Sequence, residues 1–207
     1  ADGRVHHLRF ADLEQSSDAA PGGIVELRNW TDRHGRPGQS LWVRSDLPLG
    51  EQITARGSSW LDRQLLSSDP VQTLGGFGTE IEQAKAERAE HLISEGLATR
   101  RGGRLVLARE LLSTLRSREL NETCDAIAAR TGLPHRPSAE GDTVSGIYRE
   151  RLQLASGRFA MIDDGLGFEL VPWHPQLDRH LGQHVTGMVK AGGGIDWTIG
   201  RSRGISL

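Results

Sequence analysis

The chain has 207 residues, with 25 Lys and Arg against 27 Asp and Glu, and a formal net charge of −2. Hydrophobic residues make up 36% and charged residues 25% of it, which suits one large or two to three small packed domains and argues against general disorder. Near-neutral charge excludes a uniformly basic nucleic-acid-binding protein. A DNA contact therefore has to be sought in local patches.

The single cysteine, Cys124, excludes an internal disulfide and a multi-cysteine metal site, and it fits a reducing cytosol. No apolar run approaches the roughly 20 residues that span a bilayer, and no signal peptide is recognisable. The arginine-rich composition is typical of a bacterial protein. We therefore expect a bacterial cytoplasmic protein without a membrane partner. Because the chain begins with Ala1 and Asp2, we expect it to be a segment of a longer protein.

Residues 1–48 form the first predicted module. Short β-prone runs at 23–28 and 40–44 flank the segment 29–38, which is dense in turn-forming residues. The pattern predicts a small β meander or half-barrel. His6 and His7 would face opposite sides of a strand, so they do not suggest a metal site.

Residues 49–133 form a predicted helical module that resembles a winged helix. Apolar spacing predicts an amphipathic helix over 51–66 and a second helix that starts with a capping box from Thr79 to Glu82. Gly96 is placed to end that helix. Two short runs around Gly102 and Gly103 then predict a hairpin, and helical spacing follows from 111 to 132.

The predicted hairpin is locally basic. Six arginines and one acid, Glu110, lie between residues 97 and 118, a balance of +5. Arg100, Arg101 and Arg104 crowd the hairpin tip, where a guanidinium can bind phosphate oxygens. Two interpretations stay open: contact with the DNA backbone, or a solvated hairpin paired with neighbouring glutamates.

Residues 134–143 are rich in proline and small residues and predict a linker. Beyond it, residues 144–207 carry β-type runs at 144–154, 158–163, 166–171, 184–190 and 195–200, with a short helix at 176–181. Three strands, a helix and two strands predict a small β-barrel, either an OB-fold or an SH3-like barrel. The predicted fold class is thus α+β with several modules.

Several side chains in the predicted barrel bear on function. Asp163 and Asp164 are explained by a turn and Glu169 by an outward strand position, while Tyr148 lacks the sequence context of a nucleophile. We predict no catalytic residue, no metal site and no cofactor. Trp173 and Trp197 would either stack on bases or pack in the core. The remaining predicted DNA contacts are basic: Arg149, Arg151, Lys190, Arg201 and Arg203.

Four stretches resemble a known family. SGRFAMIDDGLGFELVPW (156–173) and GGGIDWTIGRSRGISL (192–207) resemble the C-terminal region of VirD-like conjugative relaxases, the plasmid mobilisation nucleases. RSDLPLGEQITARGSSWLDRQLL (44–66) and ERAEHLISEGLATR (87–100) are similar to the part that precedes it. That region is catalogued in the family as a domain of unknown function.

The resemblance implies a non-catalytic role for this segment. Such relaxases nick DNA with an N-terminal tyrosine assisted by a histidine-bound metal, and neither motif is present in this chain. The resemblance implies DNA binding at or near the origin of transfer in plasmid or integrative-element transfer. The alternative is a protein-interaction or secretion-signal module that contacts relaxosome proteins or the coupling protein of type IV secretion.

Overall fold

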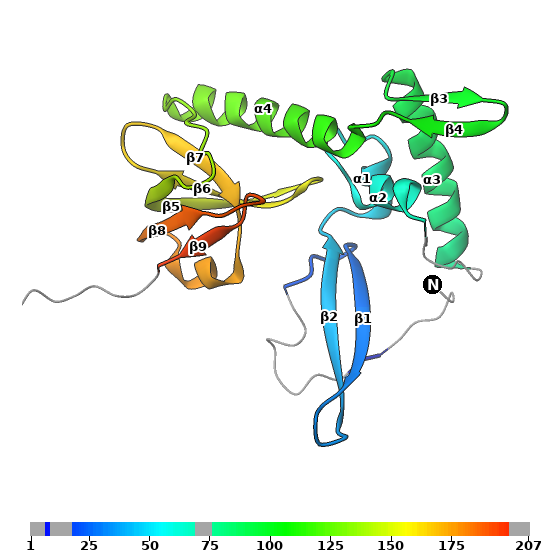
Figure 1. Cartoon of the computed structure of the whole chain (residues 1–207), viewed down its shortest axis with the longest axis horizontal. Helices are drawn as coiled ribbons and strands as arrows, with labels where there is room; N and C mark the ends of the chain where they lie inside the picture. Colours follow the sequence, from blue (N-terminus) through cyan, green and yellow to red (C-terminus); the bar gives the residue numbers. More distant parts are fainter. Residues whose placement is uncertain (1–6, 9–17, 69–75, 199–207) are drawn as a thin grey trace, which may run out of the picture. The chain divides into compact units, whose positions relative to one another are not determined.

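The structure, a computed structural model, describes residues 7–8, 18–68 and 76–198. It is an α+β protein, as predicted, with a five-stranded antiparallel sheet and several helices (Figure 1). The chain divides into two compact units, unit 1 (1–119) and unit 2 (120–207). The predicted module boundaries at 48/49 and 133/134 stay predictions. No helix in the described ranges is long and apolar enough to cross a bilayer.

Unit 1 contains two hairpins and a group of helices. Its elements are β1 (Ile24–Thr31), β2 (Pro37–Ser45), α1 (Leu49–Ile53), α2 (Trp60–Leu66), α3 (Phe77–Ser94), β3 (Ala98–Arg101) and β4 (Arg104–Leu107), followed by the first part of α4 (Leu111–Thr131). Unit 2 contains the rest of α4, then β5 (Thr143–Leu154), β6 (Gly157–Asp163), β7 (Phe168–Pro172), the 3-10 helix η2 (Pro175–His180), β8 (His184–Val189) and β9 (Ile195–Trp197).

β1 and β2 form a two-stranded antiparallel hairpin. The described residues here make this hairpin alone rather than the predicted meander of several strands. Residues 1–6 and 9–17 of the predicted module lie outside the described residues. An isolated two-stranded hairpin is marginally stable in water. The base is secured because Ile24 packs into an apolar cluster with Trp60 and Leu61 of α2.

The helix predicted over 51–66 is wrong as a single element, because a capped start at Ser59 divides it into α1 and α2. The Ser59 hydroxyl accepts from the Asp62 backbone N–H, and the Asp62 carboxylate accepts from the Ser59 N–H. This reciprocal pattern is a capping box, with Asp in place of the usual Glu. Buried Gln52 joins the two short helices by donating to Leu47 O and accepting from Leu61 N.

The centre of unit 1 is a fully buried ion pair between Arg88 of α3 and Asp62 of α2. Arg88 Nε donates to Asp62 Oδ1 at 2.8 Å and a terminal nitrogen donates to Oδ2 at 2.9 Å. The same guanidinium also donates to the carbonyls of Ile53, Ala55 and Gly57. All five guanidinium donors are thereby used, and the irregular segment between α1 and α2 is tied to α3.

The capping box predicted from Thr79 to Glu82 is also wrong. α3 begins earlier, at Phe77, so Thr79 lies inside its first turn, and Glu82 instead pairs with Lys85. The predicted end at Gly96 is confirmed, with a φ of +71°. The predicted hairpin is confirmed as β3 and β4, which Gly102 and Gly103 join with φ values of +56° and +78°.

Unit 2 is built on an antiparallel sheet in the order β7-β6-β5-β8-β9. All five predicted strands are confirmed, with small differences at their ends, and the predicted short helix is the 3-10 helix η2. One face of the sheet holds a cluster that includes Val144, Tyr148, Ile162 and Leu177. This face supplies the core of the unit.

The opposite face of β6 and β7 is buried as well. Cys124 and Ile127 of α4 form a cluster with Met161 of β6 and Phe168 of β7. The second part of α4 therefore covers this outer face, and β6 is buried along most of its length. Strands that are covered on both faces lose the alternation of polar and apolar residues.

The predicted linker runs along β7. Arg136 N donates to Phe168 O at 2.8 Å, Phe168 N donates to Pro134 O at 3.0 Å, and the Ser138 hydroxyl bonds the Glu169 carboxylate. The beginning of the segment is thus held against the sheet of unit 2 by backbone hydrogen bonds.

Replacing Arg88 with Met should lower the free energy of unfolding by about 3–5 kcal/mol, because Asp62 would stay buried without its counter-charge. Urea denaturation at pH 7 measures the change. The matched control is Lys85→Met, on the same helix and partly exposed, which should change stability by no more than about 0.5 kcal/mol. An Arg88→Met protein as stable as the parent would contradict the central role of the ion pair.

Candidate nucleic-acid interface

The β3–β4 hairpin, here called the wing, carries exposed arginines at its tip. Arg101 and Arg104 are direct cross-strand partners in the antiparallel register, and both are exposed. Like charges placed directly opposite each other destabilise a strand pair. Within the described residues neither side chain has an ion pair or a hydrogen bond to a carboxylate. The wing therefore presents two uncompensated cations at its end.

Arg100, the third predicted wing residue, differs from its neighbours. Its guanidinium pairs with the Glu90 carboxylate of α3, and both side chains are exposed. Such a surface pair is weak and screened by salt, so Arg100 can exchange this partner for a phosphate at little cost.

Further cations lie just after the wing. Arg109, Arg116 and Arg118 are exposed at and after the start of α4, and Arg118 lies 3.7 Å from Glu95. The outward face of α3 has the opposite sign. Its exposed acids are Glu80, Glu82, Glu87 and Glu90. Unit 1 thus combines a basic wing with an acidic helix.

The three predicted basic residues of unit 2 that the structure describes each have an acidic partner. Arg149 Nε donates to Asp163 at 2.8 Å, and Arg149 is the extra residue at a bulge in β5. Arg151 lies 3.4 Å from Asp178, and Lys190 lies 3.2 Å from Asp196. These pairs reduce the positive potential of unit 2. Arg201 and Arg203 lie outside the described residues.

Trp173 is partly buried and packs against the core of unit 2. Two guanidinium groups lie over its ring, that of Arg151 at 5.0 Å and that of Arg158 at 5.4 Å from the centroid. The ring already makes cation–π contacts, so an incoming base would have to displace an arginine. Trp197 is buried in the same core and cannot stack on a base.

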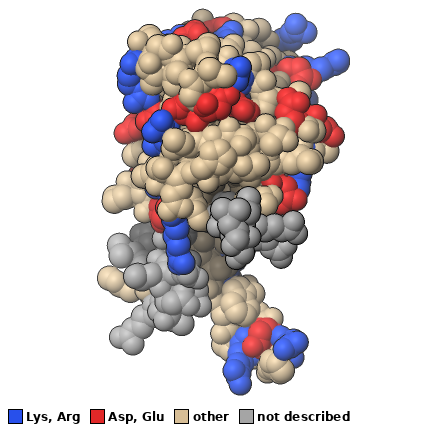
Figure 2. Space-filling model, turned by 90° about the vertical axis from the view of Figure 1, so that its left-hand side faces the viewer, with Lys and Arg blue, Asp and Glu red and all other residues tan. Residues whose placement is uncertain are grey.

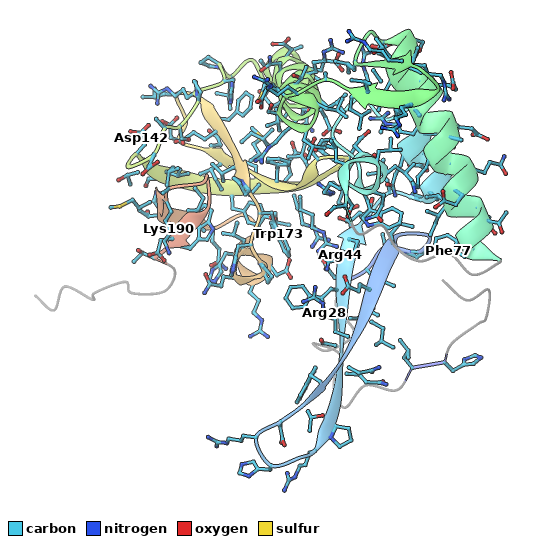
Figure 3. All side chains as sticks on the ribbon, turned by 45° about the vertical axis from the view of Figure 1, so that its right-hand side comes forward. Arg28, Arg44, Phe77, Asp142, Trp173 and Lys190 are labelled. Atoms are coloured by element: carbon cyan, nitrogen blue, oxygen red, sulfur yellow. The ribbon has the colours of Figure 1, made fainter. Side chains whose placement is uncertain are left out.

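The β1–β2 hairpin carries exposed aromatic residues that our sequence analysis did not assign to a function. Trp30 is 48% exposed and Trp42 is 49% exposed. Arg28, which is labelled in Figure 3, lies over the Trp42 ring at 4.8 Å from its centroid. In the sequence, tryptophans are interspersed with arginines between residues 28 and 44. This pattern does not by itself indicate that the tryptophans are exposed, because a tryptophan in a strand is usually buried.

Tyr148 and Asp164, whose side chains are of types that can take part in catalysis, are held by the fold. Tyr148 is 2% exposed, and burial raises the pKa of its phenol. Asp164 accepts backbone hydrogen bonds from Leu166 and Gly167, which lower the pKa of its carboxyl and fix the turn. Across residues 7–8, 18–68 and 76–198 no group of three metal-ligating side chains is present.

Residues 31–206 match the model of a family described as a protein of unknown function (DUF3363). A search of curated proteins gave no match, and a search of solved structures gave none either. The family match covers most of the chain but carries no activity with it.

Cys124 should be inert in the folded protein. It is buried against the sheet, and burial raises the pKa of its thiol to about 11, so almost no thiolate is present at pH 8. A thiol reagent at pH 8 should label the native chain far more slowly than the urea-unfolded chain. Equal rates in both states would contradict the packing of α4 on β6 and β7.

Proposed function

The chain belongs to the DUF3363 family, and we propose that it is a non-catalytic DNA-binding module of a conjugative relaxase. In this proposal the module holds DNA at or near the origin of transfer. The observation that carries it is the wing, where Arg101 and Arg104 face each other without an acidic partner among the described residues. A phosphate between them would relieve the repulsion of the two charges.

The order of elements in unit 1 supports the winged-helix part of the proposal. Three helices, α1, α2 and α3, are followed directly by the β3–β4 hairpin. The wing packs through Leu97 and Ala98 against Leu92 of α3 and Leu111 of α4. Its arginines are therefore presented from a fixed base.

The acidic face of α3 decides how such a unit would dock. A helix that enters the major groove runs between two rows of phosphates, which would repel the four exposed glutamates. The wing is instead suited to the outside of the backbone. Contacts of this kind fix position and carry no sequence information. We therefore expect DNA binding that depends weakly on sequence and strongly on salt.

The connectivity of unit 2 favours an OB-like over an SH3-like sheet. Its first strand, β5, is central and pairs with β6 and β8, and η2 joins the third strand to the fourth. OB-folds commonly bind nucleic acid on the face of their second and third strands. In this chain α4 covers that face of β6 and β7. For that reason the proposal assigns the main DNA contact to the wing.

Replacing Arg100, Arg101 and Arg104 together with Ala should weaken binding to duplex DNA and flatten its salt dependence. The slope of log Kobs against log salt should fall in magnitude by about 0.9 for each phosphate that the variant no longer neutralises. Fluorescence anisotropy across a salt series measures both. The control replaces three exposed arginines of unit 2, Arg130, Arg136 and Arg179. A wing variant that binds with the affinity and slope of the parent would refute the proposal.

The second candidate is a protein-interaction or secretion module that contacts relaxosome proteins or the type IV coupling protein. The observation that favours it is the row of exposed acids on α3, which suits a basic protein partner.

Changing Glu80, Glu82, Glu87 and Glu90 to Gln distinguishes the two candidates. If α3 is a protein-binding face, the variant should lose affinity for a purified relaxosome or coupling protein while it retains DNA binding, because the wing arginines are all present and Arg100 is released from its pair with Glu90. Surface plasmon resonance against each purified partner provides the measurement, with the triple wing variant as the reciprocal control. Unchanged partner binding would exclude α3 as that face.

A further inference from the structure

The β1–β2 hairpin has one face lined by aromatic and charged side chains, here called the ribbon face. The antiparallel register pairs Glu26 with Trp42, Arg28 with Ser40, and Trp30 with Gly38. Since paired residues point to the same side of a sheet, both tryptophans and Arg28 share this face. The opposite face carries Val25, among other residues.

Both tryptophans lie open to solvent and are held in place. A Cβ at Gly38 would come within 2.3–2.6 Å of the Trp30 ring, so that ring lies directly on the glycine backbone while the residue stays 48% exposed. The Trp42 indole N–H donates to the Ser40 hydroxyl at 3.1 Å. Two half-exposed, oriented indoles on a hairpin are an exposed apolar feature of the kind that marks interaction sites.

The ribbon face and its turn are basic. Arg28, Arg33, Arg36 and Arg44 stand against Glu26 and Asp32, a balance of four positive to two negative charges. Both acids are occupied: Glu26 pairs with Arg28 and Arg44, and Asp32 accepts the backbone N–H groups of His34 and Arg36. Figure 2 shows the basic side chains around the acid at the lower end of the molecule, which is the hairpin turn.

The spacing of the two tryptophans along the ribbon face suits a flexible chain that carries flat aromatic bases. Trp42 lies opposite Glu26, four residues from Trp30 along β1, which is about 13 Å at the rise of a β-strand. Arg28 lies between them. Aromatic platforms alternating with cations are the arrangement by which proteins bind single-stranded nucleic acid, because every base has a face to stack and every linkage a negative charge.

We propose that the β1–β2 ribbon face binds single-stranded DNA, with one base stacked on Trp30 and one on Trp42, where it displaces the Arg28 guanidinium from the ring. The displaced Arg28 and the turn arginines Arg33 and Arg36 then hold phosphates. In duplex DNA the base faces are already stacked on one another, so the ribbon discriminates against it. The inference rests on the proposed DNA-binding function, and it adds a second surface with its own strand preference to that of the wing.

The test replaces Trp30 and Trp42 together with Leu, which keeps an apolar side chain and removes the stacking surface. Anisotropy is measured with oligo(dT) of about 20 nucleotides and with a duplex of equal length. We expect at least roughly a tenfold loss of affinity for the single strand and an unchanged affinity for the duplex. The Trp→Phe double variant should recover part of the loss. Val25→Ala, on the opposite face of the same hairpin, is the matched control.

The other possible results of the binding experiment contradict either the ribbon inference alone or the proposed function as well. Equal single-strand affinity of the parent and the Leu variant overturns the inference, and so does an equal loss for single strand and duplex. If the parent binds the duplex but no single strand at low salt, the ribbon inference fails while the proposed function stands. If the parent binds neither form, both fail. Thermal unfolding and duplex binding of the Leu variant confirm that it is folded.

Discussion

The ion pair between Arg88 and Asp62 is the constraint on which unit 1 depends. A guanidinium in an apolar interior is costly unless every donor is used, and this one binds two carboxylate oxygens and three carbonyls. Those carbonyls belong to the last residue of α1 and to the irregular segment that follows it, and without Arg88 they would be acceptors without a partner. The pair therefore orders the α1–α2 segment and fixes it to α3, which in turn supports the wing.

The second constraint is the packing of α4 on the outer face of β6 and β7. It covers β6 and β7 on their second side and removes the surface that such sheets often use for ligands. Among the described residues, two hairpins remain as exposed candidate surfaces. The wing offers charge without aromatic residues, and the ribbon face offers both. This difference is the physical reason for assigning them different forms of DNA.

The candidate site was only partly predictable from the sequence. The wing arginines follow from a Gly-Gly turn between two short runs, a local signal that folding does not alter. The tryptophans of the ribbon face have no such signal, because exposure depends on what packs above a strand. Trp173 shows the converse: the sequence allows base stacking, but its side chain packs against the core of unit 2 and two guanidinium groups lie over its ring.

By itself the sequence determined the α+β class, all five strands of the sheet and the wing turn. Each of these follows from local rules, such as alternation, glycine turns and residue spacing. Only the tertiary structure decided that 51–66 is two helices, that Arg88 is buried, and that α4 covers β6 and β7. These features depend on contacts between residues far apart in the chain, such as the 26 positions that separate Asp62 from Arg88.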